Sequence, residues 1–400
     1  MKAWRLGAGV GVLVSALVIG GASCGDDDDG GGGGGQQVDA DPLNLEIISV
    51  TLPDGAGARP VVRFRVGDQA GAPVDLAAEI AAANASPAGV PNTIPRFTLA
   101  QLDDLGNYTS LYASTVNPRT YTAPEGQTPP PAVAKEQASY QPAARTAAGA
   151  AAPWPVADLR TVGAGVFEFT MPATTVAADR TKTHTLAMWV ERRRTAADSD
   201  VAYGSHNFVP AGGAAQRDEA VTDAACNRCH GVLQAHGVRR GTQLCMTCHS
   251  PQTSDPETSR TVDFQVMVHK IHMGRDLPSV QQGENYYIVG YNGSIHDYSE
   301  VAFPWHDGVQ HCTVCHAGED GDNWRQKPSI TACTSCHDNV KFAAGEATQA
   351  CSALTAETAT QDCIHSGGPL TVANADEVTS CATCHGPGAA NAVDRYHHGD

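Results

Sequence analysis

The chain has 400 residues, and its 26 lysines and arginines against 43 aspartates and glutamates give a formal net charge of −17. This acidic balance excludes a protein that holds nucleic acid through a basic surface. Hydrophobic residues make up 42% of the sequence but aromatic residues only 6%. Apolar side chains alone therefore form a small hydrophobic core for a chain of this length. Cysteine and histidine are in excess, with 13 and 16 copies. All cysteines except Cys24 lie after position 225, so the chemistry is expected in the C-terminal half.

The first residues have the pattern of an export signal. A short basic start, an apolar stretch over 6–20 and three small residues precede Cys24. The apolar stretch is shorter than the ~20 residues of a membrane-spanning helix, and the arrangement resembles a bacterial lipoprotein signal. We therefore predict a signal over 1–24 that ends at a lipidated Cys24, and a flexible Asp/Gly tether over 25–43. The alternative is a plain secretory signal with a spare thiol; either way, the cysteines reach an oxidising compartment.

The next segment, 44–205, has the pattern of an antiparallel β sandwich or barrel. Strand-like runs, which alternate polar with apolar residues or are β-branched and aromatic, lie at 45–51, 61–66, 165–170 and 183–190. The stretch 117–155 is rich in Ala and Pro and is expected to be a long loop. His184 lies inside a strand pattern and is interpreted as a structural or exposed residue. Nothing in this segment indicates catalysis.

Five copies of C-x-x-C-H dominate the rest of the chain, which we treat as one domain over 206–400. The cysteines are Cys226 and Cys229, Cys245 and Cys248, Cys312 and Cys315, Cys333 and Cys336, and Cys381 and Cys384. The histidines that follow them are His230, His249, His316, His337 and His385. This is the attachment sequence of c-type haem, in which two thiols bind the porphyrin and the histidine is the proximal iron ligand. Redox or zinc C-x-x-C pairs are the alternative, but neither requires a histidine after every second cysteine.

Five covalently attached haem c groups are therefore the expected cofactors. The domain has few apolar side chains for its length, so the porphyrins are expected to form its core and to be required for its folding. Cys351 and Cys363 remain outside the motifs. In an exported chain they are expected to close a short loop as a disulfide, with two free thiols as the alternative.

The other histidines are numerous enough to give every iron a second histidine. Eleven remain for five irons, and bis-histidine coordination favours low-potential electron transfer. The run 262–272 has the pattern of a helix that carries His269 and His272 on one face, with Cβ atoms about 5–6 Å apart. If both are ligands, they serve two neighbouring haems, as electron hopping requires. The alternative is an exposed histidine pair.

Three further segments carry a resemblance to a known family. They are Met-Val-His-Lys-Ile-His-Met-Gly at 267–274, Ile-His-Asp-Tyr-Ser-Glu-Val-Ala-Phe-Pro at 295–304 ahead of a haem motif, and Ala-His-Gly-Val-Arg at 235–239. Together they resemble the OmcA/MtrC family of outer-membrane multihaem cytochromes. The resemblance implies a lipoprotein that passes electrons out of the cell to metal oxides, flavins or partner cytochromes. Family members have two pentahaem domains alternating with β domains, whereas this chain has one of each.

The same resemblance implies the distal iron ligands. Position by position it assigns His236, His269 and His272, and His365 resembles another ligand position. The fifth is either His397 or His398, with His398 slightly favoured. His206 and His296 are reserves, and His306 and His311 flank the third motif as exposed or propionate-contacting residues.

We therefore predict an α+β multidomain protein, a β sandwich or barrel followed by a loop-rich pentahaem domain with short helices. The expected function is an electron conduit at the outer membrane, on the cell surface or the periplasmic face, rather than a substrate-specific enzyme, and no catalytic residue is assigned. At low salt, its acidic surface should favour binding to positively charged minerals or to basic patches on partner proteins. The first alternative is a multihaem reductase of a small oxyanion or nitrogen compound, with one open iron. The second is a surface interaction protein whose haems act as a redox sensor.

Overall fold

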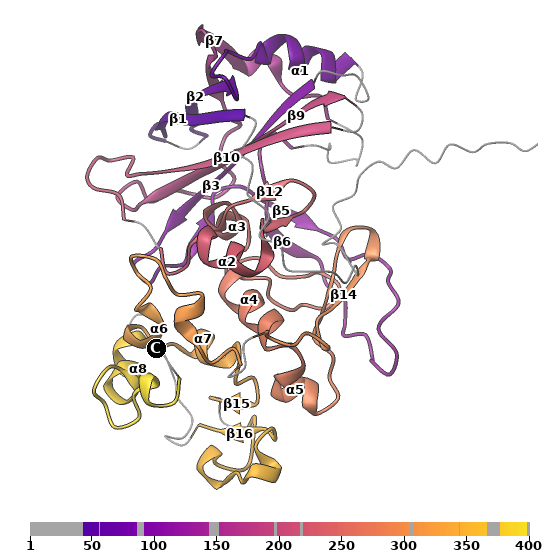
Figure 1. Cartoon of the computed structure of the whole chain (residues 1–400), viewed down its shortest axis with the longest axis vertical. Helices are drawn as coiled ribbons and strands as arrows, with labels where there is room; N and C mark the ends of the chain where they lie inside the picture. Colours follow the sequence, from indigo (N-terminus) through magenta and orange to yellow (C-terminus); the bar gives the residue numbers. More distant parts are fainter. Residues whose placement is uncertain are drawn as a thin grey trace, which may run out of the picture.

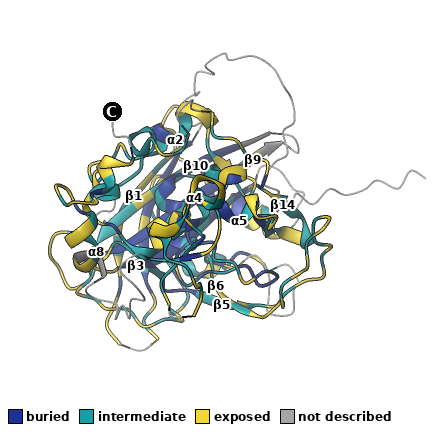
Figure 2. Cartoon of the chain, turned by 90° about the horizontal axis from the view of Figure 1, so that it is seen from below, coloured by how far each residue is buried: buried dark blue, intermediate teal, exposed yellow. Residues whose placement is uncertain are grey.

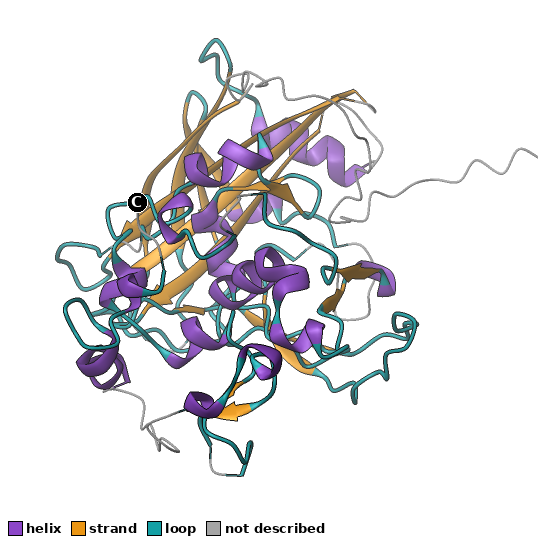
Figure 3. Ribbon diagram, turned by 60° about the horizontal axis from the view of Figure 1, so that its bottom comes forward, coloured by secondary structure: helices purple, strands orange, loops and turns teal. Residues whose placement is uncertain are grey.

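The computed structural model describes residues 43–397, with gaps at 56, 86–91, 144–151, 196–197, 217–218, 305–307, 344 and 366–376. The expected signal, Cys24 and most of the tether lie outside the described residues. Long strands occupy one part of the molecule and short helices joined by loops occupy the other (Figures 1 and 3). Within the described ranges, no helix is long and apolar enough to cross a membrane.

The first part is built from two four-stranded antiparallel sheets. One has the order β1-β2-β8-β7, with bounds Leu43–Thr51, Val61–Asp68, Val166–Thr170 and Leu159–Gly163. The other has the order β10-β9-β3-β4, with bounds Asp198–Phe208, His184–Thr195, Asn92–Leu102 and Tyr108–Ser110. A short ladder joins β5, Ala113–Val116, to β6, Lys135–Ala138. Helix α1, Leu76–Ala85, packs beside β3.

The two sheets share one apolar core, because their strands alternate in burial. In β2, Val62, Phe64 and Val66 are fully buried while Arg63 and Arg65 face solvent. Buried side chains from β8, β3 and β9 complete the same cluster: Phe167, Phe169, Phe97, Leu99, Leu186, Met188 and Val190. An alternation with period two buries one face of each strand. The result is a sandwich with its core between the sheets.

The predicted fold class is therefore confirmed, an antiparallel β domain followed by a loop-rich one. The four strand-like runs correspond to β1, β2, β8 and β9. The expectation of a loop throughout 117–155 is wrong at one point, because Lys135–Ala138 forms β6. That run contains no proline, so its backbone amides are free to pair with β5.

The second part contains short elements. The α-helices are α2, Asp223–His230; α3, Thr242–Cys248; α4, Phe264–Met273; α5, Pro278–Gln281; α6, Asn323–Gln326; α7, Ile330–Thr334; and α8, Glu377–His385. The strands are β11, Gln234–Ala235; β12, Arg239–Arg240; β13, Tyr287–Val289; β14, Ile295–Asp297; β15, Val340–Lys341; and β16, Cys363–Ile364. Most of these residues are half-buried or exposed, whereas the dark blue buried segments of Figure 2 gather in the long strands.

The two parts meet where α3 packs against β3, β4 and β9. The hydroxyl oxygens of Thr98 on β3 and Thr247 on α3 lie 2.7 Å apart, and both residues are fully buried. Leu244 of α3 packs with Ala187 and Trp189 of β9. The helix that carries the second C-x-x-C-H motif therefore packs directly on the sandwich.

Candidate haem-binding sites

Each C-x-x-C-H motif begins or lies within a helical turn. The motifs occupy α2, α3, the 3-10 turn Cys312–Val314, the end of α7 and α8. The amide of the motif histidine donates to the carbonyl of the first motif cysteine, at 2.8 Å for His249, 2.9 Å for His316 and 2.8 Å for His337. A helical turn places residues three and four apart on one face. The two thiols and the imidazole thus face the same side of the chain, as attachment to one porphyrin requires.

Every motif histidine lies opposite a second histidine. The ring centroids are 5.7 Å apart for His249 and His236, 6.0 Å for His230 and His272, 6.1 Å for His316 and His269, 6.0 Å for His337 and His397, and 6.0 Å for His385 and His365. A metal–imidazole bond is about 2 Å long, and two such bonds plus the two ring radii add to roughly 6 Å. The spacing of all five pairs therefore fits one iron between two imidazoles.

Hydrogen bonds leave one ring nitrogen of several histidines available for a metal. The Nδ1 atoms of His249, His272 and His385 lie 2.8, 2.8 and 3.0 Å from the carbonyl oxygens of Val262, Val268 and Asn391. A carbonyl accepts a hydrogen bond and cannot donate one, so Nδ1 carries the proton in these rings. The Nε2 lone pair is then free for iron, and the carbonyl fixes the ring orientation.

Burial favours the neutral, metal-binding form of His236 and His269. It lowers the pKa of His236 to about 3, with the charge of Arg239 adding to the effect, and lowers the pKa of His269 to about 4. Burial also raises the pKa of the thiol of Cys245 to about 12. None of the ten motif cysteines forms a disulfide. The donor set, two free thiols and two imidazoles per site, fits haem c at all five positions.

Contacts between the motifs arrange the sites in a row. The thiol of Cys226 lies close enough to those of Cys245 and Cys315 for each to affect the other's pKa. Arg228 of the first motif donates to the carbonyl of Val314 in the third. The first three motifs therefore lie in the order second, first, third.

The row continues through the fourth motif to the fifth. The Nδ1 atom of His269, the histidine opposite the third motif, lies 3.2 Å from the hydroxyl of Ser335 in the fourth motif. The amide of His365, the histidine opposite the fifth motif, donates to the carbonyl of Lys341 at 2.9 Å. Lys341 follows the fourth motif by four residues, so the full order is second, first, third, fourth, fifth.

A disulfide between Cys351 and Cys363 lies beside the fifth site. Cys363 is fully buried in β16, which pairs with β15 in parallel. Two residues further on, the ring of His365 stacks on Phe342 at 5.1 Å between centroids. The stapled loop and the two short strands therefore hold the histidine that faces His385.

The remaining histidines of the sequence analysis lie elsewhere. His206 is on β10, where it stacks on Phe208, and His184 is buried beside the same ring. The Nε2 atom of His296 lies 3.1 Å from the hydroxyl of Ser294. His306 and His398 lie outside the described residues. The structure places His397 opposite His337, although the sequence slightly favoured His398.

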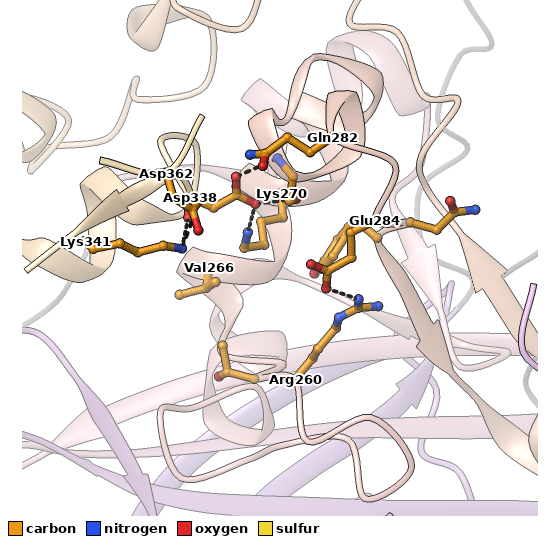
Figure 4. Close-up of a pocket in the computed structure, with 12 residues that line it drawn as sticks. Arg260, Val266, Lys270, Gln282, Glu284, Asp338, Lys341 and Asp362 are labelled. Carbon is orange, nitrogen blue, oxygen red and sulfur yellow. Dashed lines mark hydrogen bonds and ion pairs between the residues drawn. The ribbon is translucent and has the colours of Figure 1, made fainter. Parts of the chain in front are cut away.

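A mixed-charge cavity of about 450 Å³ separates the α4 helix from the segment after the fourth motif. Figure 4 shows Lys270 and Asp338, which both line it, pointing toward each other, with Nζ 2.7 Å from Oδ2. Arg260 and Glu284 form a second ion pair at 2.9 Å. Asp338 also accepts from the Ser279 hydroxyl at 2.7 Å. The charged groups of this cavity are thus paired, and Lys270 fixes the helix that carries His269 and His272.

Three supporting residues were missed from the sequence. Ser335 contacts His269, Phe342 stacks on His365, and Asp338 anchors Lys270. Ser335 is a variable position inside its motif, and nothing in the sequence pairs Phe342 or Asp338 with a partner more than twenty residues away. Their roles depend on the tertiary arrangement alone.

The comparisons with known proteins agree with this geometry. Residues 218–398 match the family described as outer membrane cytochrome MtrC/MtrF-like, domains II/IV. The structure is similar to that of the outer membrane decaheme cytochrome OmcA, with a TM-score of 0.59 and 21% identity, over 78% of this chain and 45% of that one. MtrC from Shewanella baltica OS185 matches with a TM-score of 0.48 and 17% identity, over 86% of this chain and 43% of that one. No curated protein matches. The chain thus spans less than half the length of either solved structure.

Proposed function

We propose that the chain is an outer membrane cytochrome of the OmcA/MtrC kind, because residues 218–398 match the MtrC/MtrF-like family model, and that it carries electrons through five closely spaced bis-histidine haems to an acceptor outside the cell. The observation that carries the proposal is the set of five histidine pairs, each 5.7 to 6.1 Å between ring centroids. Haem c, when bound, supplies one-electron iron chemistry.

The residues of the chain attach, orient and shield the cofactors. The motif cysteines would attach each porphyrin, and the two paired imidazoles of each site would bind its iron. Carbonyl oxygens such as that of Val262 hold the rings at a fixed angle through Nδ1. Such rigid ligation keeps the coordination unchanged between the two oxidation states, which favours electron transfer over substrate chemistry.

The row of sites defines a path. It starts at the second motif, which is seated on the β sandwich, and ends at the fifth motif in α8. Figure 1 shows α3 beside the strands and α8 in the lower left part of the molecule, away from the long strands. We propose that electrons move along this row, and that the two ends exchange them with partner cytochromes and external acceptors such as metal oxides or flavins.

We also propose that the chain is held at the outer membrane by lipid on Cys24. The Asp/Gly tether over 25–43 would separate the sandwich from the membrane surface. The formal charge of −17 becomes more negative with haem propionates, so exchange with positively charged acceptors should weaken as ionic strength rises. A Cys24→Ala variant should appear in the soluble fraction; retention in the membrane fraction would contradict the anchor.

A reductase of a small oxyanion would need an iron with one open axial position. Each of the five motif histidines faces a second histidine, so no site of the described chain favours that alternative. The conduit is therefore the function that the geometry supports best.

Low-temperature EPR of the oxidised, haem-loaded chain tests the proposal, with spins quantified against five irons. We expect only low-spin signals. His397→Ala should convert one fifth of the iron to high spin, while the matched control His398→Ala should leave the spectrum unchanged. A high-spin component of about one iron in the unmodified protein would contradict the conduit and indicate an open site.

A further inference from the structure

The second sheet of the sandwich carries a row of three large side chains on the face away from its core. Arg96 of β3 pairs with Trp189 of β9, and Trp189 pairs with Tyr203 of β10. The strand neighbours of Trp189, Met188 and Val190, are buried in the core, so Trp189 itself lies on the opposite face. It is nevertheless only 5% exposed. The haem-binding region covers it.

Trp189 contacts the segments that carry both histidines of the second site. Leu244 of α3 packs against it, one residue before the motif that ends in His249. The guanidinium carbon of Arg239 in β12 lies 4.9 Å from the centre of its ring. The strand β12 pairs with β11, which ends one residue before His236. One side chain of the sandwich is therefore in contact with the proximal and the distal segment of one haem site.

The β11–β12 hairpin, residues 234–240, has few contacts of its own to fix its shape. Its ladder consists of two residue pairs, and a hairpin of that size is unstable by itself in water. His236 lies in the connecting loop at φ +49, in the left-handed region. A residue with a side chain keeps that conformation where surrounding contacts hold it. The position of His236 thus depends on contacts outside the hairpin.

Arg239 makes such a contact with the sandwich. Besides Trp189, its guanidinium faces the ring of Tyr140 at 5.0 Å, and the two rings meet edge to face at 5.4 Å between centroids. Aromatic faces attract cations, more strongly where water is excluded. Val238, the preceding residue, packs against the cluster that contains Trp189. The hairpin is therefore held against the sandwich directly after the loop that carries the distal histidine.

We propose that Trp189 and Arg239 are positioning residues of the second haem site, and that the β sandwich is a structural part of that site. Trp189 contacts α3 and the β11–β12 hairpin at once. Together with Arg239 it keeps the rings of His236 and His249 at 5.7 Å between centroids, the spacing at which one iron fits between them. This inference rests on the proposed function, because it assumes an iron that both imidazoles bind.

EPR of the oxidised, haem-loaded full chain tests the proposal in Arg239→Gln and in Trp189→Leu. We expect high-spin iron of up to one fifth of the total in both variants, because His236 is no longer held against its iron. Added imidazole should return this fraction to low spin. The low-spin component that is lost should be the one that is also lost in His236→Ala. Arg239→Lys keeps a cation over the two rings and should retain most of the low-spin signal.

Two controls separate positioning from general damage. Trp154 is also a 5% exposed tryptophan, but it packs on Phe169 in the sandwich core, at 4.6 Å between ring centroids. Trp154→Leu should therefore destabilise the sandwich and leave all five irons low-spin. Arg240→Gln removes a charge from the same strand as Arg239. Arg240 bonds Gln234 at 2.7 Å in an exposed contact within the hairpin, so this variant should leave the spectrum unchanged.

An entirely low-spin spectrum of either Arg239→Gln or Trp189→Leu would overturn the proposal, as would the same high-spin fraction in either control. If a variant loads fewer than five haems, mass spectrometry of its haem peptides decides. Loss confined to Cys245 and Cys248 supports the proposal, and loss spread over several motifs rejects it. A high-spin iron in the unmodified chain would refute the conduit, whereas unchanged low-spin spectra of the variants refute only the positioning role.

Discussion

In the β sandwich the interior is made of apolar side chains, whereas the recurring feature of the haem-binding region is a pair of histidines, none of which is fully buried. Phenylalanine rings of both sheets pack at 5.1 to 5.8 Å between centroids, with Phe97 in contact with Phe64 and Phe169. The clusters of buried apolar side chains that the structure describes all centre on the sheets. After position 218 the recurring contact is between two histidine rings. The first region can therefore bury its own apolar surface, and we expect the second to require bound haem to do so.

Removing haem should produce the largest difference in stability between the two regions. In a variant with all ten motif cysteines replaced by alanine, we expect residues 218–397 to lose their structure, because the paired imidazoles would have nothing between them. The sandwich should remain folded. Hydrogen exchange measures this: amides of α4 should exchange freely, while those of β3 and β9 should stay protected. Protection of α4 without haem would show that the region has a side-chain core of its own.

Removing a large side chain from the sandwich core should destabilise the sandwich and leave the haem-binding region unchanged. Phe97 is fully buried between the sheets, so Phe97→Ala should lower the free energy of unfolding of the sandwich by about 3–5 kcal/mol. Denaturant titration of the haem-loaded chain measures it, with haem absorbance as a separate signal. The control Leu105→Ala, at a side chain 44% exposed, should change stability by less than about 0.5 kcal/mol. A loss of low-spin haem in Phe97→Ala would mean that the two regions unfold as one unit.

The disulfide is the covalent cross-link between described residues in the haem region. Cys351→Ser with Cys363→Ser should cost about 2–4 kcal/mol, because the closed loop restricts the unfolded chain. The larger signal should be spectroscopic, since β16 ends one residue before His365. We expect a high-spin fraction of up to one fifth of the iron. Phe342→Leu, which removes the stacking partner of His365 but keeps the disulfide, should give a smaller fraction.

An entirely low-spin spectrum in the double serine variant would show that the β15–β16 ladder alone holds His365. In that case the loop between the two cysteines would be a local feature without influence on the fifth site.

The sequence motifs alone predicted the two cysteines and the proximal histidine of each site. The distal histidines were assigned through the family resemblance. A C-x-x-C-H motif places three functional groups within five residues, so local geometry is enough to define it. The facing histidines come from other segments, and only the helix pattern around His269 and His272 gave a geometric clue. The choice between His397 and His398 depends on the 3-10 turn Val393–Arg395, which the sequence does not specify.

In the sandwich, too, local sequence patterns predicted some elements and missed others. Runs of β-branched and aromatic residues predicted β1, β2, β8 and β9. The strand β3 was missed because it contains Pro95, and β10 because it is polar along much of its length. Both are strands because β9 pairs with them on its two edges. Tertiary pairing here outweighed local preference.

The smallest predicted effect concerns the contact between the two regions. Thr98→Val keeps the shape of the side chain but removes a hydroxyl 2.7 Å from that of Thr247. Thr247 still donates to the carbonyl of Leu244 at 2.7 Å, so no donor is left unsatisfied and the cost should be about 1 kcal/mol. Thermal unfolding of the haem-loaded chain measures it, with Thr161→Val on exposed β7 as the control, expected within about 0.5 kcal/mol of the unmodified protein. A cost several times larger would mean that this hydroxyl pair, rather than the apolar packing of Leu244 on Trp189, seats the second haem on the sandwich.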